Sequence, residues 1–224
     1  MVLKKWVIAL LFIIPVLLFG CKQENTDELP LIFAVVSPYE NSATVYIGSR
    51  YYNFNSLSVS VNSVNLINDG AGNYYTGSLP SLSAGSNVTL LISGEENSRS
   101  FHVNVSAIVP TSATNVQPSA GVNWKYNTSE TVTCTPGNGA RTTYVVFDNN
   151  NANRWITSNS ITSTGSYTFS SSKNSPYYLN STDKVKVTVI SSNKTYITDN
   201  TDSQSALVVE QENALQYVIR NTQF

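Results

Sequence analysis

The sequence predicts an all-β protein made of two β-sandwiches in tandem. Apolar residues occur in short alternating runs that end at Gly, Asn, Asp, Ser or Pro, the pattern of strands joined by turns. Charged residues are only 12% of the chain, while Ser, Thr, Asn and Tyr are abundant. A surface of this kind is typical of β structure with polar turns. No amphipathic run of about 12 or more residues predicts a helix.

The first 21 residues predict a secretory signal peptide. Lys4 and Lys5 form a positive head, and 6–19 is an uninterrupted apolar run of 14 residues. A transmembrane helix needs roughly 20 apolar residues and does not favour an internal proline such as Pro15. Gly20 then places a small residue directly before Cys21.

The segment Leu18-Phe19-Gly20-Cys21 resembles the lipobox of bacterial lipoproteins. The resemblance implies that residues 1–20 are removed and that Cys21 carries a lipid. Residues 21–29 then form a flexible polar tether. We therefore expect a lipid-anchored protein of the bacterial cell envelope, at the outer membrane, at the cell surface or facing the periplasm. A plain signal peptide that is cut elsewhere is the alternative.

The chain that remains after residue 20 has 204 residues, with 11 basic and 14 acidic side chains. The basic side chains are scattered singly, which argues against a nucleic-acid partner. If Cys21 carries the lipid, Cys134 is the single remaining thiol and has no intramolecular disulfide partner. Cys134 alternates with Val132 in a predicted strand, so we expect its side chain to be buried.

The first half, 30–108, contains seven predicted strands: Leu31–Ser37, Ala43–Ile47, Leu57–Val61, Val64–Ile67, Asn73–Gly77, Val88–Ser93 and Arg99–Ala107. Asn62-Ser63 and Asn68-Asp69-Gly70 are predicted turns. The short hairpin, the Tyr-rich strand at 72–77 and the segment Leu79-Pro-Ser-Leu-Ser-Ala-Gly85 resemble bacterial immunoglobulin-like modules. The resemblance implies an immunoglobulin-like β-sandwich.

A segment rich in Pro, Ser and Thr, 109–119, predicts a linker between domains. The second half, 120–224, is similar to fibronectin type III modules at three places, which are 131–139, 142–148 and 183–190. Tyr144 and Val146 match the third strand of that family, whereas Cys134 and Val185 stand where it has Trp and Tyr. At the C-terminal end, we expect 205–220 to form two strands with a turn between them.

The residues suggest no enzyme and no cofactor. His102 is the single histidine, which excludes sites built from several histidines, and the alternation at 100–105 turns it outward. Asp148 to Asn151 and Asp199 to Asp202 have oxygen ligands suited to Ca²⁺, but their spacing is not that of a calcium loop. We therefore predict no catalytic residue and no metal site.

Aromatic side chains are the remaining signal for function. The sequence has three Tyr-Tyr pairs, at 51–52, 74–75 and 177–178, and each pair is expected to bury one ring and expose the other. Exposed rings suit a sugar or a protein partner, and Trp155, Tyr177 and Tyr178 are the candidate binding residues. We expect a lipid-anchored, non-catalytic module for binding, adhesion or spacing. The alternatives are a carbohydrate-binding lipoprotein and, third, an exported hydrolase.

Overall fold

The computed structural model describes residues 29–48, 57–70, 73–96, 99–117, 119, 123–125, 129–149, 154–157, 165–170, 184–198 and 201–220. These residues form strands and connections, and no helix is present among them. The strands are β1 (Leu31–Ser37), β2 (Ser42–Gly48), β3 (Ser58–Val61), β4 (Val64–Asn65), β5 (Ile67–Asn68), β6 (Tyr74–Ser78), β7 (Asn87–Glu96), β8 (Arg99–Ile108), β9 (Thr114–Gln117), β10 (Asn123–Lys125), β11 (Ser129–Thr135), β12 (Thr142–Asn149), β13 (Arg154–Thr157), β14 (Gly165–Ser170), β15 (Lys184–Tyr196) and β16 (Ala206–Arg220). The predicted all-β class is confirmed.

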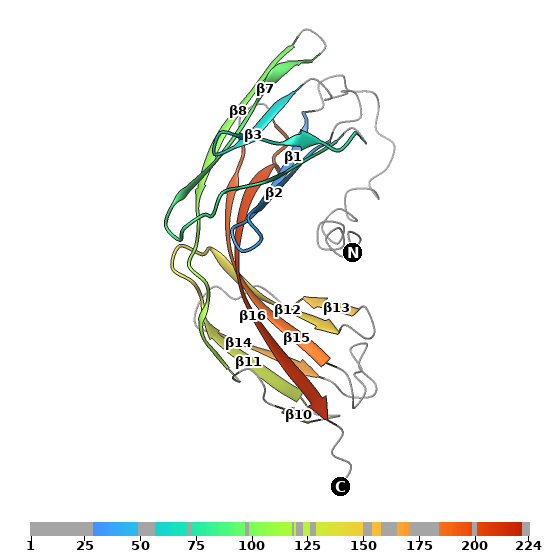
Figure 1. The fold of residues 1–224 in the computed structure, drawn as a ribbon, viewed down its shortest axis with the longest axis vertical. Coiled ribbons are helices and arrows are strands. Elements are labelled where there is room, and N and C mark those ends of the chain that lie inside the picture. Colours follow the sequence, from blue (N-terminus) through green and yellow to red (C-terminus); the bar gives the residue numbers. More distant parts are fainter. Residues whose placement is uncertain are drawn as a thin grey trace.

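Three sheets make up the described part of the molecule. The long sheet has nine strands in the order β13-β12-β15-β16-β1-β2-β6-β5, with β10 also paired to β16. The first small sheet is β4-β3-β7-β8, and the second small sheet is β14-β11-β9. In Figure 1 the molecule is a crescent, and both small sheets lie on the convex side of the long sheet. The opposite face of the long sheet lines the inside of the crescent.

Alternating side chains explain how the first sandwich closes. Ile32, Ala34 and Val36 of β1 are buried, while the residues between them are half-buried on the opposite face. The core also contains Val59 and Leu90 from the first small sheet. Burial of such side chains stabilises each by about 1.5–3 kcal/mol relative to exposure. The strand alternation predicted for this half is therefore confirmed.

The predicted strand Val64–Ile67 is wrong in one respect, because the chain changes sheets within it. β4 pairs with β3 in the first small sheet, whereas β5 pairs with β6 in the long sheet. Leu66 lies between them, is buried, and donates its N–H to the carbonyl of Val59 at 2.8 Å. This residue carries the chain from one layer of the sandwich to the other.

The expectation of two strands with a turn in 205–220 is also wrong. Ala206 to Arg220 is one strand of 15 residues, and it pairs with β15 from Lys184 to Tyr196 without a break in register. Its first part lies parallel to β1, and its last part pairs with β10. The polar residues at 210–213 remain in the strand, and each of them lies directly opposite a residue of β15.

β15 and β16 join the two halves of the chain into one sheet. Ile197, Leu207 and Val209 belong to the same core as the buried side chains of β1 and the first small sheet. Residues from the second half of the sequence thus complete the first sandwich. The division into domains at 30–108 and 120–224 stays a prediction, and the long sheet runs across it.

The segment predicted as a linker makes several specific contacts. Thr111 donates its N–H to the carbonyl of Asn138 at 3.0 Å, and the Asn138 N–H donates to Thr111 Oγ1 at 2.7 Å. The Asn213 side chain donates to the carbonyl of Ala113 at 3.0 Å. Gly137 fits here because a Cβ at its position would overlap the carbonyl of Thr111. The residues after Ala113 form β9 in the second small sheet.

Candidate functional site

The site residues predicted from the sequence lie mostly outside the described part of the chain. Cys21, Tyr177 and Tyr178 are not among the described residues. Trp155 lies in β13, where its backbone pairs with Asp148, and its side chain is not among those that the structure describes. The lipidation of Cys21 and a ligand site at these three aromatic residues therefore stay predictions.

The two residues with nucleophilic or acid–base side chains that the sequence singled out lie on different elements. His102 is exposed on β8, as the alternation predicted, and Val103 beside it is fully buried. Cys134 on β11 is 2% exposed, and burial raises the pKa of its thiol. A thiol in this state is inert rather than nucleophilic. No group of three or more His, Cys, Asp and Glu suited to a metal ion occurs among the described residues.

Asp202 shows why one acidic loop serves as a turn. Its carboxylate accepts the N–H of Gln204 at 2.8 Å, and its carbonyl accepts the N–H of Ser205 at 2.9 Å. Both bonds stay within the connection between β15 and β16, as expected for an Asp at a turn. No helix in the described residues is long and apolar enough to cross a membrane.

A row of aromatic side chains crosses the long sheet on the face inside the crescent. Cross-strand pairs place Tyr196 of β15 opposite Ala206, Ala206 opposite Phe33, Phe33 opposite Tyr46, and Tyr46 opposite Tyr74. Directly opposite residues of a sheet share one face, and the buried neighbours of Phe33 point to the other face. We call Phe33, Tyr46, Tyr74 and Tyr196 the aromatic row.

The rings of Tyr46 and Tyr74 lie beside each other. Their centres are 5.0 Å apart, and their planes are inclined by 48°. A Cβ at Gly48 would lie 2.6 Å from Cε1 of Tyr46, so the Tyr46 ring leans along its strand over this glycine. Burial, with smaller effects from Tyr46 and Asp69, raises the pKa of the Tyr74 hydroxyl, so it stays neutral.

Tyr196 is the most exposed member of the row, at 55%. The ammonium of Lys194 lies 4.5 Å from the centre of its ring, in a cation–π contact. The neighbouring row on the same face has Lys194, Val208, Val35, Thr44 and Thr76 directly opposite one another. Apart from Lys194, these two rows contain no charged side chain. The face is thus aromatic and aliphatic, with hydroxyl groups at one side.

A polar cluster lies farther along the same face. Tyr144 of β12 donates a hydrogen bond from its hydroxyl to the carboxylate of Glu210 on β16. Burial raises the pKa of Glu210, the bond from Tyr144 lowers it, and Glu212 raises it. Burial also raises the pKa of Glu212, with Lys186 lowering it and Glu40 raising it. This cluster has two carboxyl groups that are harder to ionise than ordinary ones.

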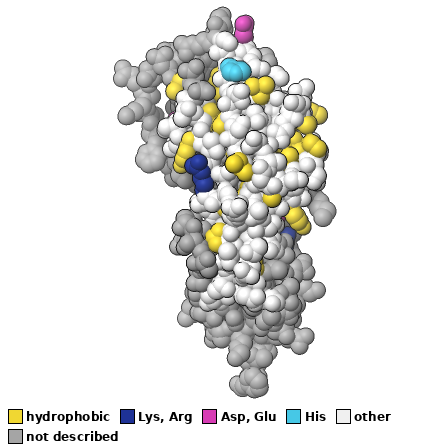
Figure 2. Space-filling model, turned by 90° about the vertical axis from the view of Figure 1, so that its left-hand side faces the viewer, with side chains coloured by type: hydrophobic (Ala, Val, Ile, Leu, Met, Phe, Trp, Pro, Cys, Tyr) yellow, Lys and Arg dark blue, Asp and Glu magenta, His cyan; other side chains and the backbone are white. Residues whose placement is uncertain are grey.

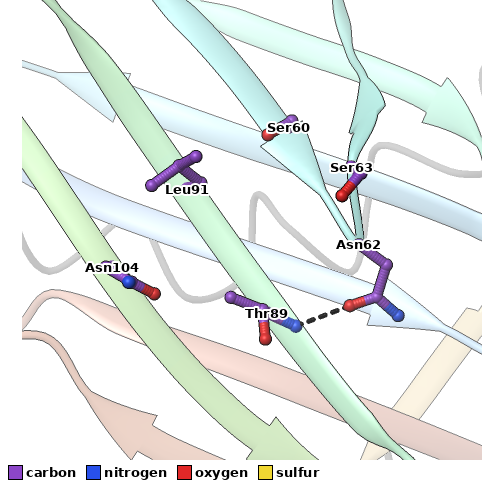
Figure 3. Close-up of a pocket in the computed structure, with 6 residues that line it drawn as sticks. All are labelled: Ser60, Asn62, Ser63, Thr89, Leu91 and Asn104. Atoms are coloured by element: carbon purple, nitrogen blue, oxygen red, sulfur yellow. Dashed lines mark hydrogen bonds between the residues drawn. The ribbon is translucent and has the colours of Figure 1, made fainter.

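The first small sheet carries a shallow hollow on its outer face (Figure 3), lined by Ser60, Asn62, Ser63, Thr89, Leu91 and Asn104. Its volume is about 460 Å³. Asn62 is used by the fold, because its carboxamide accepts the N–H of Thr89 at 2.8 Å and donates to the carbonyl of Asn87 at 3.3 Å. The Thr89 hydroxyl is bonded to that of Ser106 at 2.8 Å. The convex side of the crescent is mostly uncharged in Figure 2, with isolated apolar side chains.

The comparisons with known proteins give structural neighbours only. No protein-family model and no curated protein matches the sequence. Fibronectin(III)-like modules of Clostridium thermocellum CbhA match with 10% identity and a TM-score of 0.31, covering 87% of this chain and 93% of theirs. A two-domain fibronectin type III segment of chicken tenascin matches with 13% identity and a TM-score of 0.30, covering 84% and 99%. The β class itself rests on the strand pairing described above.

Sequence reasoning found one member of the aromatic row and missed the others. In the pair at 74–75 the two rings lie on opposite faces and Tyr75 is 2% exposed, as predicted, whereas Tyr74 is half-buried and not exposed. The same alternation applies to Phe33 and Tyr46, which occupy the positions between buried residues of β1 and β2. This pattern was the available signal for both residues.

Proposed function

We propose that this protein is an exported, lipid-anchored cell-envelope protein that acts as a non-catalytic spacer and binding module. In this proposal the lipid on Cys21 holds the chain on a bacterial membrane. Residues 22–29 form the tether. The crescent then extends away from the lipid, starting from the end at which the tether joins it. The support for export and lipidation is the signal-peptide pattern and its Cys21 ending.

The spacer role is supported by the position at which the tether joins the folded part of the chain. The carbonyl of Pro30 accepts the N–H of Asp202 at 3.0 Å, and the N–H of Ile32 donates to Ser205 Oγ at 2.9 Å. Asp202 and Ser205 lie in the connection between β15 and β16. From this connection β16 runs down to the lower end of the crescent, where β10 pairs with it (Figure 1). At about 3.3 Å per residue, a strand of 15 residues spans roughly 50 Å.

Fractionation of cells tests the anchor. Wild-type protein is expected in the membrane fraction with an incorporated lipid label. The Cys21→Ser chain is expected to lose both the label and the membrane. A Cys21→Ser chain that still takes up the label contradicts the lipid assignment. Cys134→Ser is the matched control, because it removes the other thiol and leaves the anchor in place.

Fluorescence quenching tests the spacer. The lipidated full chain is reconstituted in vesicles, with a dye attached at a cysteine introduced at Gln204 or at Arg220. Gln204 is exposed in the connection near the tether, and Arg220 ends β16. A quencher on the lipid headgroups is expected to dim the dye at position 204 much more than the dye at position 220. Equal quenching means that the crescent lies flat on the membrane, and the spacer role fails.

A further inference from the structure

We propose that the aromatic row is the binding face for an uncharged polysaccharide chain. This inference rests on the proposed function as a binding module and names the class of partner and the residues that contact it. It places the binding face on the long sheet inside the crescent, on Phe33, Tyr46, Tyr74 and Tyr196.

The first argument is the composition of this face. A sheet with one face packed on the core ordinarily has polar side chains on the other. Here, the other face has four aromatic rings, and Val35 and Val208 stand in the next row. Ala206, which lies between Tyr196 and Phe33, is fully buried, and Val208 is 6% exposed, so the larger side chains around them form the accessible surface. The surface therefore favours contact with apolar groups rather than with water.

The second argument is the shape of the row. Its members come from neighbouring strands, which lie about 4.8 Å apart in a sheet, with one small residue, Ala206, between two of them. The rings therefore form a strip that runs across the strands. Tyr46 leans over Gly48, so its ring lies along the sheet and presents a face instead of pointing its hydroxyl end outward. A strip of rings suits a linear ligand whose units stack in succession on ring faces.

The third argument is charge. A nucleic acid also stacks on aromatic rings, but it requires a positively charged groove for its phosphates. An anionic polysaccharide needs cations in the same way. In the two rows of this face the single charged group is Lys194, and its ammonium is held over the Tyr196 ring. Thr44 and Thr76 add hydroxyl groups beside the rings. Apolar ring faces with neutral hydroxyls fit sugar rings, which expose C–H faces and neutral hydroxyl groups.

Affinity electrophoresis tests the proposal with the full chain in detergent. The probes are hydroxyethylcellulose, xylan and a soluble β-1,3-glucan, with polygalacturonate as the anionic comparison. At least one uncharged polysaccharide is expected to retard the wild-type protein, and polygalacturonate is not. Retardation by polygalacturonate alone, or by none of the four, overturns the proposal.

Substitutions locate the binding face. Tyr196→Ala removes an exposed ring and is expected to weaken binding about tenfold. Gly48→Ala keeps every ring but forces Tyr46 out of its place, so similar weakening is expected. The matched control is Tyr39→Ala, because Tyr39 is 57% exposed in the β1–β2 turn, outside the row. Equal weakening by Tyr39→Ala overturns the proposal. Binding of a protein, and of no polysaccharide, to the aromatic row also overturns the proposal.

Thermal unfolding of each variant shows whether lost binding comes from lost structure. Because the Tyr196 side chain is exposed, Tyr196→Ala is expected to leave the fold intact. This variant therefore still tests the binding face if Gly48→Ala unfolds the protein. A failure of the proposed lipid anchor is distinguished from a failure of the polysaccharide proposal by a different assay. If Cys21→Ser stays lipid-labelled on the membrane, the proposed function is wrong, whereas the polysaccharide assay in detergent does not depend on the lipid.

Discussion

The Tyr144 hydroxyl reaches over β15 to donate a hydrogen bond to the Glu210 carboxylate on β16. Ile190 and Ser192 of β15 lie between them and are 2% and 4% exposed. The bond therefore closes over side chains on the face of the long sheet that neither small sheet covers. It also ties β12 of the second half to the strand that pairs with β1.

Tyr144→Phe tests the contribution of this bond. The change leaves the ring in place and removes the donor, so a half-buried carboxylate loses its partner. We expect the free energy of unfolding to fall by about 1–3 kcal/mol, measured by urea denaturation at pH 7. Tyr39→Phe is the control, since that ring is exposed in a turn. An unchanged midpoint for Tyr144→Phe contradicts a stabilising bond.

The raised pKa values of Glu210 and Glu212 predict that stability depends on pH. Both carboxyl groups have folded-state pKa values above the ordinary 4.5, so the folded chain binds more protons than the unfolded chain above that pH. Their contribution is fully present below pH 4.5, and it is lost as the pH rises through the raised values. Glu212→Gln is expected to flatten this fall and to raise stability at pH 7.

Denaturation of both chains between pH 4 and pH 8 measures the effect. The difference between wild type and Glu212→Gln is expected to grow as the pH rises, because the penalty of burying a charged carboxylate is then present only in the wild type. Glu40→Gln is a weaker version of the same change, since Glu40 is exposed and raises the pKa of Glu212. A difference that shrinks with rising pH has the wrong sign for this account.

Local patterns in the sequence were sufficient to predict most strands and turns of the first sandwich. The alternation of Ile32, Ala34 and Val36 predicts the buried face of β1, and β1 has the predicted bounds. Asn62 and Ser63 have φ of 47° and 66°, as a two-residue hairpin turn requires. These features depend on neighbours only a few residues away, so a single sequence contains them.

The same local patterns do not predict which strands pair when they are far apart in the sequence. β1 lies parallel to β16, with Phe33 opposite Ala206, although 173 positions separate them. The alternation at Leu207 and Val209 predicts a buried strand but not which strand it joins. The aromatic row depends on four strand registers at once, and one of them is this long-range pairing of β1 with β16. A sequence shows which face each ring occupies, while only the sheet order brings the rings together.

Cys134 is predicted to be unreactive in the folded chain. Its side chain is 2% exposed and burial raises its thiol pKa, so the thiolate that reacts with disulfide reagents is scarce and shielded. In a Cys21→Ser chain at pH 8, a thiol titration is expected to find almost no reactive thiol until urea unfolds the protein. Rapid reaction of one thiol under native conditions contradicts the burial of this strand face.

Leu207→Ala tests whether the two halves of the chain unfold as one unit. Leu207 lies in the second half of the sequence and is fully buried in the core of the first sandwich. Truncation of a buried leucine costs about 2–5 kcal/mol. Trp124 and Trp155 lie in β10 and β13 of the second half, so tryptophan fluorescence reports on that half once Trp6 is replaced by Phe.

Because β15 and β16 belong to both halves, we expect fluorescence and far-ultraviolet circular dichroism to give one coincident transition in urea. Leu207→Ala is expected to shift both signals to lower urea by the same amount. Val132→Ala, at a fully buried position of the second small sheet, is the reciprocal control and is expected to do the same. A fluorescence transition that stays in place while circular dichroism shifts means that the second half unfolds independently. In that case the shared strands separate at the boundary, and the crescent is a pair of jointed domains instead of a rigid spacer.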